Sequence, residues 1–221
     1  EDITDKPGAK DLPPIRGHVT FDKVNFSYEP GNPILKDVDF VITPGMRVAI
    51  VGPTGAGKTT IVNLLSRFYN PDEGKIMIDG LDINDLTIKS IRQQVGVMLQ
   101  DSFLFTGSII DNIRYGRLDA TDEECMNAAK AVQAHEFISA FPDGYNTQLS
   151  ANGGGLSAGQ KQLISFARVL LSDPRILILD EATSSVDTQT EKALQKGLDE
   201  LLKHRTSFII AHRLSTIRNA D

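Results

Sequence analysis

The amino-acid sequence predicts an α/β fold built around a parallel sheet. Runs dominated by apolar residues at 47–51, 175–180 and 207–211 are typical of strands that are buried on both faces. Segments with helical patterning, among them 157–172 and 188–202, lie between these runs. Strands that alternate with helices along a chain favour a parallel sheet with helices against it.

The composition excludes several classes of protein. The 221 residues are 40% hydrophobic and 24% charged, which is ordinary for a globular chain and excludes collagen-like or disordered sequences. The 23 basic and 29 acidic residues give a net charge of −6, so we expect no nucleic-acid partner. Cys125 is the single cysteine, which excludes an internal disulfide and a cysteine-based zinc site. Every apolar run is shorter than the ~18 residues that a transmembrane helix needs.

Residues 1–17 are expected to form a linker, followed by one domain over 18–221. The segment contains Pro7, Pro13 and Pro14 with little apolar periodicity, so we expect it to contribute nothing to a core. The chain ends at Asp221 in a helix-like stretch that has no cap or breaker. Both ends therefore suggest a piece of a longer polypeptide that is truncated at its C-terminus.

The N-terminal part of the domain is expected to be rich in strands. Apolar residues spread through 19–28 and alternate over 38–42, which favours two half-exposed strands. The Gly- and Pro-rich segment 29–33 predicts a turn between them. Pro44-Gly45 then turns the chain into the buried strand at 47–51.

The second half of the chain carries clear helix signals. Thr121 with Glu124, and Ser157 with Gln160, match the capping box, in which the first residue caps the helix and the fourth reaches back. The helix after Ser157 should end before Asp173-Pro174, because proline cannot continue it. We expect Cys125 to pack as a small apolar residue, and His18, His135 and His204 to have structural roles only.

The segment 52–59 matches the phosphate-loop pattern G-x-x-x-x-G-K-[ST], between a predicted strand and a predicted helix over 60–68. Glycines let successive backbone N–H groups point inward, where they and the helix N-terminus can hold phosphate oxygens. We expect Lys58 to reach the β- and γ-phosphates and the Thr59 hydroxyl to bind Mg²⁺. A Gly-rich turn with an incidental lysine is the structural alternative. The expected nucleotide-binding residues here are Gly52, Pro53, Thr54, Gly55, Ala56, Gly57, Lys58, Thr59 and Thr60.

An acidic pair, Asp180-Glu181, directly follows the predicted strand at 175–180. Ligands of open parallel sheets bind beyond the carboxyl ends of the strands, which places this pair at such a site. Asp180 is suited to bind Mg²⁺, and Glu181 is suited to polarise an attacking water as a general base. Capping of a following helix is the structural alternative.

Further motifs resemble those of ATP-binding cassette (ABC) proteins. The run 156–160 reads Leu-Ser-Ala-Gly-Gln, similar to the LSGGQ signature of that family, and Ser157 lies 23 positions before Asp180. Tyr28 stands where the family has an aromatic residue that stacks on adenine, and Gln100 resembles the Q-loop glutamine. The run 184–187 resembles the D-loop, and His212 resembles the switch histidine. The motifs occur in the family's order and cover about residues 17–221.

The resemblance implies a RecA-like P-loop NTPase core, an antiparallel β subdomain and an inserted α-helical subdomain at about 101–172. It implies an ATPase that uses ATP and Mg²⁺, with Glu181, His212 and Gln100 in catalytic roles and Thr59, Gln100 and Asp180 around the metal ion. In the family, a signature such as Ser157, Gly159 and Gln160 contacts the γ-phosphate of ATP held by an opposite subunit, which implies a head-to-tail dimer. Taken alone, Tyr28, Gln100 and His212 would be assigned structural or surface roles, and Ser157 would be a plain N-cap.

The segment 105–113 resembles that of exporter-type ABC transporters, and the Pro-rich start fits a chain whose membrane helices precede the ATPase. The expected protein is therefore a bacterial exporter, located at the cytoplasmic face of the cell membrane. Its expected partners are the transmembrane domain of the same polypeptide and a second ABC domain. A soluble ABC ATPase acting on DNA or ribosomes and a separate importer ATPase are the alternatives.

Two positions depart from the family's pattern. Ala158 replaces a glycine of the signature, with a minor expected effect. Ser150-Ala151 stands where exporters commonly have Gly-Glu, which puts one contact with the membrane domain in doubt. This departure suggests that the transporter could be a heterodimer with unequal subunits instead of a homodimer.

Overall fold

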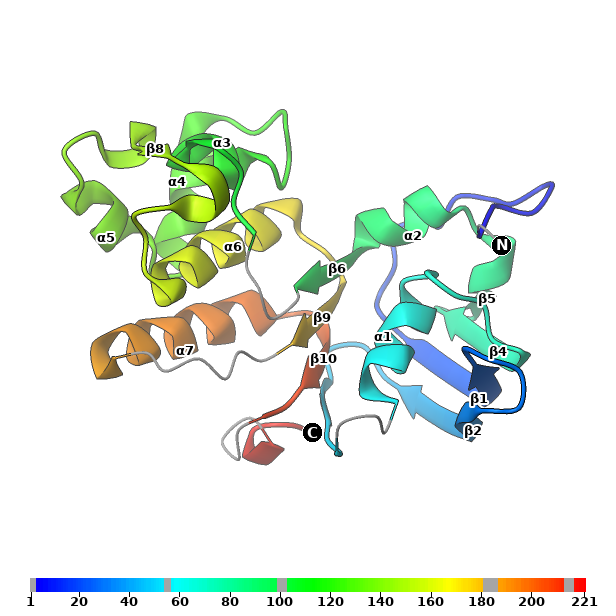
Figure 1. Cartoon of the computed structure of the whole chain (residues 1–221). Helices are drawn as coiled ribbons and strands as arrows, with labels where there is room; N and C mark the ends of the chain where they lie inside the picture. The colour runs from blue at the N-terminus through cyan, green and yellow to red at the C-terminus, as the bar shows by residue number, and fades with distance from the viewer. Residues whose placement is uncertain (1–2, 54–56, 99–102, 181–186, 213–216) are drawn as a thin grey trace. The chain divides into compact units, whose positions relative to one another are not determined.

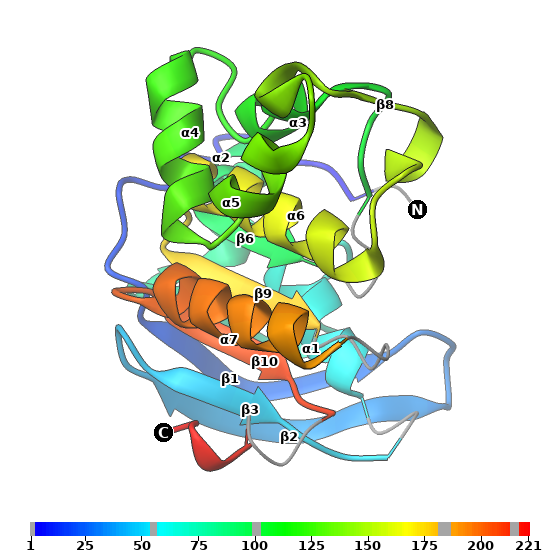
Figure 2. The same cartoon turned by 90° about the vertical axis from the view of Figure 1, so that its left-hand side faces the viewer.

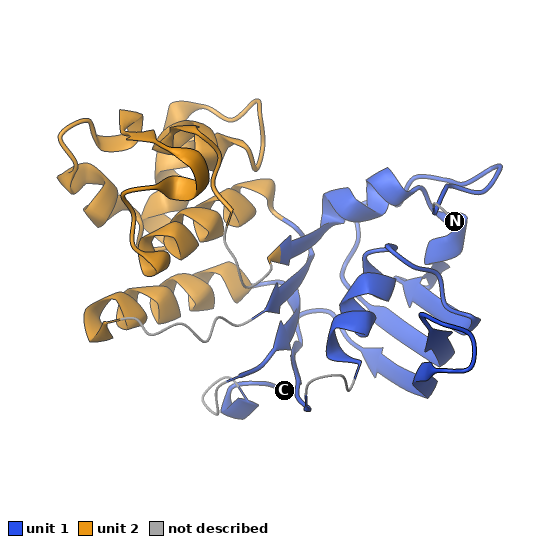
Figure 3. Ribbon diagram, in the orientation of Figure 1, with its two compact units in different colours: residues 1–97, 174–181, 204–221 blue, residues 98–173, 182–203 orange. Residues whose placement is uncertain are grey.

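The computed structural model describes residues 3–53, 57–98, 103–180, 187–212 and 217–221. Figure 1 shows the chain, which divides into two compact units (Figure 3). Unit 1 comprises residues 1–97, 174–181 and 204–221, and unit 2 comprises 98–173 and 182–203. Within the described ranges, every helix is too short or too polar to span a bilayer.

An antiparallel four-stranded sheet forms one part of unit 1, in the order β2-β1-β4-β5. Its strands are β1 (Val19–Ser27), β2 (Pro33–Ile42), β4 (Glu73–Ile78) and β5 (Leu81–Asp82). Alternate residues of β1 are buried, among them Phe21, whose ring stacks on that of Phe40 in β2 at 4.5 Å between centroids. The two half-exposed strands expected from alternation are thereby confirmed.

The second sheet of unit 1 has the order β3-β10-β9-β6 (Figure 2). Its strands are β3 (Arg47–Ile50), β10 (Thr206–Ile210), β9 (Ile176–Asp180) and β6 (Val95–Met98). β10 is parallel to both β3 and β9, which confirms the parallel sheet. The prediction of a fully buried strand at 47–51 was wrong, because β3 is at the end of this strand order. All four of its residues are half-buried, and Val51 is 54% exposed.

The core of unit 1 contains side chains from both sheets and from helix α1 (Lys58–Leu65), of which Val62, Leu64 and Leu65 are buried. α1 begins two residues before the expected helix and ends three residues before its expected end. The chain then reaches β6 through the 3₁₀ turn η1 (Ile83–Asp85) and helix α2 (Ile88–Gln94).

The N-terminal segment contributes to the core of unit 1. Leu12 and Ile15 are only 5% and 6% exposed, so the expectation that residues 1–17 bury nothing was wrong. The segment is held because α2 supplies partners for its backbone: Leu12 N donates to Ser90 Oγ at 2.8 Å, and Gln94 Nε2 donates to the Leu12 carbonyl at 3.0 Å. A composition argument does not include such long-range hydrogen bonds.

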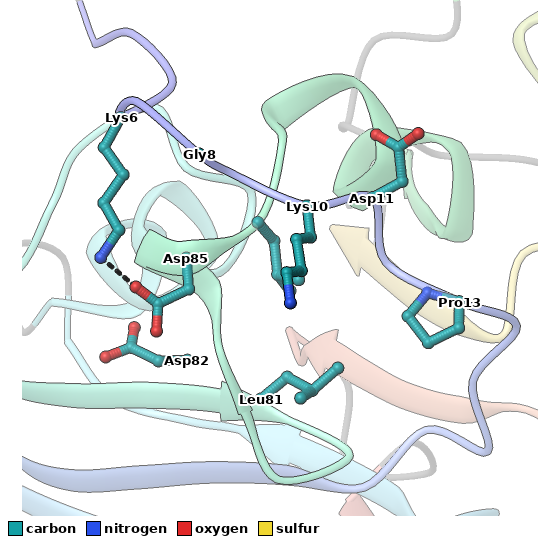
Figure 4. A pocket seen from close by; sticks show the side chains of 9 residues that line it. Lys6, Gly8, Lys10, Asp11, Pro13, Leu81, Asp82 and Asp85 are labelled. Carbon is teal, nitrogen blue, oxygen red and sulfur yellow. Dashed lines mark ion pairs between the residues drawn. The ribbon is translucent and has the colours of Figure 1, made fainter.

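The same segment borders an open pocket of about 450 Å³, which Figure 4 shows. Lys6 and Lys10 line it from the N-terminal segment, and Asp82 and Asp85 line it from β5 and η1. Lys6 pairs with Asp85 across the opening. The pocket is therefore lined by charges of both signs.

Unit 2 is mainly helical. Its helices are α3 (Ile109–Arg114), α4 (Asp122–Ala131), α5 (His135–Ala140), α6 (Ala158–Ser172) and α7 (Thr188–Leu202). The short strands β7 (Gly107–Ser108) and β8 (Gln148–Leu149) pair with each other, and the turns η2 (Gly144–Asn146) and η3 (Ala151–Gly153) flank β8. α6 contacts α3, α4 and α7. Both predicted capping boxes are present, at Thr121 and at Ser157, and Cys125 is buried as expected.

Candidate nucleotide site

The parallel strands of unit 1 bring three predicted site segments to one edge. Ile210 at the end of β10 lies opposite both Ile50 of β3 and Asp180 of β9. The chain therefore leaves the sheet at the same edge toward Gly52, beyond Asp180, and toward His212. This is the edge at which parallel α/β sheets bind ligands.

The phosphate-loop helix starts at Lys58, and Gly57 occupies its N-cap with φ 94°. A side chain at this position would be strained, and its Cβ would lie 2.9 Å from Leu35 Cδ2. Since glycine has no side chain to cap the helix, the first backbone N–H groups remain suited to an anion. Lys58 Nζ donates to the carbonyl oxygen of Gly52 at 2.6 Å, so the lysine reaches back to the start of the loop.

Asp180 and His212 meet at this edge. His212 Nε2 lies 3.0 Å from Asp180 Oδ1, and the two side chains are 30% and 23% exposed. The sequence places these residues 32 positions apart, and the pairing of β9 with β10 brings them together.

The residues present fit a magnesium ion. The predicted ligands that the structure describes are the exposed Thr59 hydroxyl and the carboxylate of Asp180, both hard oxygen donors. Mg²⁺ is ordinarily bound by one or two carboxylates together with substrate phosphates and water, so a small protein ligand set is sufficient.

Tyr28 directly follows β1 and is 44% exposed. Its hydroxyl lies 3.1 Å from Thr60 Oγ1, and Asn63 Nδ2 donates to it at 3.0 Å, so it is bonded to α1. The sequence analysis did not single out Asn63. Its position three residues after Thr60, on the same helix face, is the signal that could have identified it.

The signature segment forms the N-terminus of α6 in unit 2. Ser157 Oγ accepts from Gln160 N at 3.1 Å, and Gln160 Oε1 accepts from Ser157 N at 3.0 Å. Ser157 is exposed, Gly159 is buried, and the first turn of α6 carries no acidic residue. The positive end of this helix dipole is therefore not neutralised from within its own first turn.

Several predicted residues lie outside the described part of the chain. Asp187, the last residue of the predicted D-loop, is described and caps α7, where its side chain accepts from Thr190 N at 3.0 Å. The predicted residues outside the description are Thr54, Gly55, Ala56, Gln100, Glu181, Ser184, Ser185 and Val186.

Comparison with known proteins decides the family. Residues 35–184 match the family model described as "ABC transporter". The chain belongs to the ABC transporter family. This assignment confirms the resemblance that the six motifs carried, and it identifies the chain as the ATP-binding, ATPase part of an ABC transporter.

Individual relatives agree with this assignment. The chain is 52% identical over 225 residues to the "Fatty acid ABC transporter ATP-binding/permease protein" of Mycobacterium tuberculosis (strain CDC 1551 / Oshkosh). It is 55% identical over 221 residues to the "Uncharacterized ABC transporter ATP-binding protein YfiC" of Bacillus subtilis (strain 168). Both matches cover 100% of the chain, which spans 36% and 37% of the length of these relatives.

The fold is that of a solved ABC exporter. A chain in the "Structure of a bacterial Atm1-family ABC exporter with ATP bound" superposes with a TM-score of 0.90 at 46% sequence identity. The match covers 100% of this ABC domain and 38% of the exporter chain. The mixed α/β fold predicted from the sequence is thus confirmed.

Proposed function

We propose that this ABC domain binds ATP with Mg²⁺ at the edge of its parallel sheet and hydrolyses it to ADP and phosphate to drive export. The carrying observation is the arrangement of Lys58, Asp180 and His212 in unit 1. A lysine on a phosphate-loop helix, a strand-end carboxylate and a histidine after the neighbouring strand suit triphosphate chemistry.

Each residue has a proposed task in the reaction. The backbone of 52–60 and the Lys58 ammonium hold the β- and γ-phosphates, and Tyr28 stacks on the adenine. Thr59, Asp180 and Gln100 hold Mg²⁺, which supplies neutralisation of phosphate charge when bound. Glu181 accepts a proton from water as the water oxygen bonds to the γ-phosphorus and the bond to the β-γ bridging oxygen breaks. His212 donates a hydrogen bond to the γ-phosphate.

The partner proposed for this domain is a second ABC domain, in a homodimer or a heterodimer. The exposed N-terminus of α6, with Ser157, Gly159 and Gln160, would contact the γ-phosphate of ATP bound by that partner. Two ATP molecules would then bridge the head-to-tail dimer, and hydrolysis would remove the bridge and allow the dimer to open.

The proposed location is the cytoplasmic face of a membrane, with residues 1–17 leading from a transmembrane domain of the same polypeptide. The names of the relatives, which join ATP-binding and permease functions, support an exporter over a soluble ABC ATPase acting on DNA or ribosomes.

Substitution of the phosphate-loop lysine tests the proposed ATP site. Lys58→Ala should raise the Kd for Mg²⁺-ATP at least tenfold, measured by titration calorimetry. Lys36→Ala, which removes the same charge from an exposed position of β2, should leave the Kd unchanged. An unchanged affinity in Lys58→Ala would refute the phosphate-binding role.

A further inference from the structure

The hydroxyl group of Tyr28 lies between two polar side chains of α1. Asn63 Nδ2 donates to the Tyr28 oxygen at 3.0 Å, and Thr60 Oγ1 lies 3.1 Å from the same oxygen. An oxygen that accepts from the amide can still donate its own proton to Thr60. Thr60 is 3% exposed, so its side chain is fixed by the core of unit 1 and anchors this chain of hydrogen bonds.

Two aromatic neighbours restrict the ring of Tyr28. Phe26 and Tyr69 meet it nearly perpendicularly, with interplanar angles of 88° and 84° and centroid distances of 4.8 and 5.0 Å. Such edge-to-face contacts are favourable and fix the tilt of a ring. The tyrosine nevertheless stays 44% exposed, so much of its surface remains open to a ligand.

The group that holds Tyr28 is part of the phosphate-binding element. Asn63 and Thr60 belong to the helix that begins with Lys58 and Thr59, the residues proposed to hold the triphosphate and its metal ion. A hydrogen bond from this helix to Tyr28 therefore fixes the distance between the aromatic ring and the phosphate loop. A ring that is ordered before binding lowers the entropic cost of binding the base.

We propose that Asn63 is a positioning residue for nucleotide binding, which acts through the Tyr28 hydroxyl and orients the ring for the adenine base. The proposal rests on the proposed function, in which Tyr28 stacks on adenine. It predicts that Asn63 contributes to recognition of the base and makes no contribution to recognition of the phosphates.

A double-mutant cycle tests this assignment. The Kd values for Mg²⁺-ATP are measured for Tyr28→Phe, Asn63→Ala and the double variant. Loss of one hydrogen bond corresponds to about a fivefold weaker affinity, so each single variant should raise the Kd about fivefold. The double variant should be no weaker than either single variant, because both remove the same interaction.

Inorganic tripolyphosphate, which has no base, is the second probe. Its affinity should be unchanged in all three variants, since the phosphate loop is intact. In ATPase assays, KM for ATP should rise in Asn63→Ala while kcat stays at the parental value. Three results would each overturn the proposal: an unchanged ATP affinity in Asn63→Ala, additive losses in the double variant, or an equal loss of tripolyphosphate affinity, which would indicate a general defect of α1.

Tyr28→Ala separates this proposal from the proposed function. Weaker ATP binding in Tyr28→Ala with normal binding in Asn63→Ala would overturn the positioning role and leave the stacking role intact. Normal ATP binding in Tyr28→Ala would overturn both roles of Tyr28. Thermal unfolding of every variant verifies folding, and alanine at position 63 favours the helix.

Discussion

Ser157 has two roles in this account, as the N-cap of α6 and as a contact for the partner's ATP, and matched substitutions separate them. Ser157→Ala removes the oxygen that accepts from Gln160 N at 3.1 Å. Loss of an N-cap acceptor costs about 1 kcal/mol of stability. The cost concerns the whole of unit 2, because α6 buries Leu163, Ile164 and Phe166 in its core.

Thr121 provides the control within the same unit. It forms the same capping box at α4, where its side chain accepts from Glu124 N at 3.2 Å, so Thr121→Ala should also cost about 1 kcal/mol. The first turn of α4, however, contains three acidic residues, whereas that of α6 contains none. Only the α6 terminus is suited to a phosphate, so Ser157→Ala alone should also lower ATPase activity.

Ser157→Asp is the sharper perturbation. Aspartate caps a helix as well as serine, so the urea midpoint of unfolding should stay close to that of the parent chain. Its carboxylate would stand at the position proposed for a γ-phosphate, so ATPase activity and ATP-dependent dimerisation should fall at least tenfold. Thr121→Asp should leave both unchanged. Parental ATPase activity in a folded Ser157→Asp variant would refute the role of the α6 terminus at the partner's nucleotide.

Three further substitutions test the description of the fold. Arg67, 2% exposed, donates to the carbonyls of Ile83 and Leu86 at 3.3 and 2.8 Å, so Arg67→Ala should lower the free energy of unfolding by about 3 kcal/mol in urea titrations; a loss under 1 kcal/mol would contradict this. Gly197→Ala should destabilise the chain despite the higher helix propensity of alanine, because the new Cβ would lie 2.5 Å from the Val132 carbonyl oxygen; a raised Tm would show the reverse. Burial raises the pKa of Tyr145 to about 12 from its ordinary 10, so the folded state keeps a proton that the unfolded state loses, and stability should fall as pH rises from 10 to 12. That loss should be smaller in Tyr145→Phe, and equal slopes in the two proteins would contradict the shift.

Local rules predicted the helices of unit 2 well. The capping boxes fix where α4 and α6 begin, and α7 spans 188–202 as expected, since caps and breakers act within one turn of the chain. The half-buried state of β3 could not be predicted in this way. Its residues are as apolar as those of β9, and its exposure depends on its place at the end of the strand order.

The candidate site shows the same limit. The phosphate loop and Asp180 are identified by their own sequence patterns, and His212 is identified by its place in an ordered set of motifs. The contact between His212 and Asp180 depends on the pairing of β10 with β9, which follows from the tertiary fold. Asn63 lacks a pattern of its own, because its proposed importance comes from Tyr28, 35 positions away.

The central claim is that this ABC domain closes on ATP as a dimer and opens after hydrolysis. The most direct measurement is the molar mass of the Glu181→Gln variant by light scattering, with Mg²⁺-ATP and with Mg²⁺-ADP. The account predicts a dimer in ATP, a monomer in ADP, and hydrolysis close to zero. A monomer in ATP, or hydrolysis at the parental rate, would contradict it.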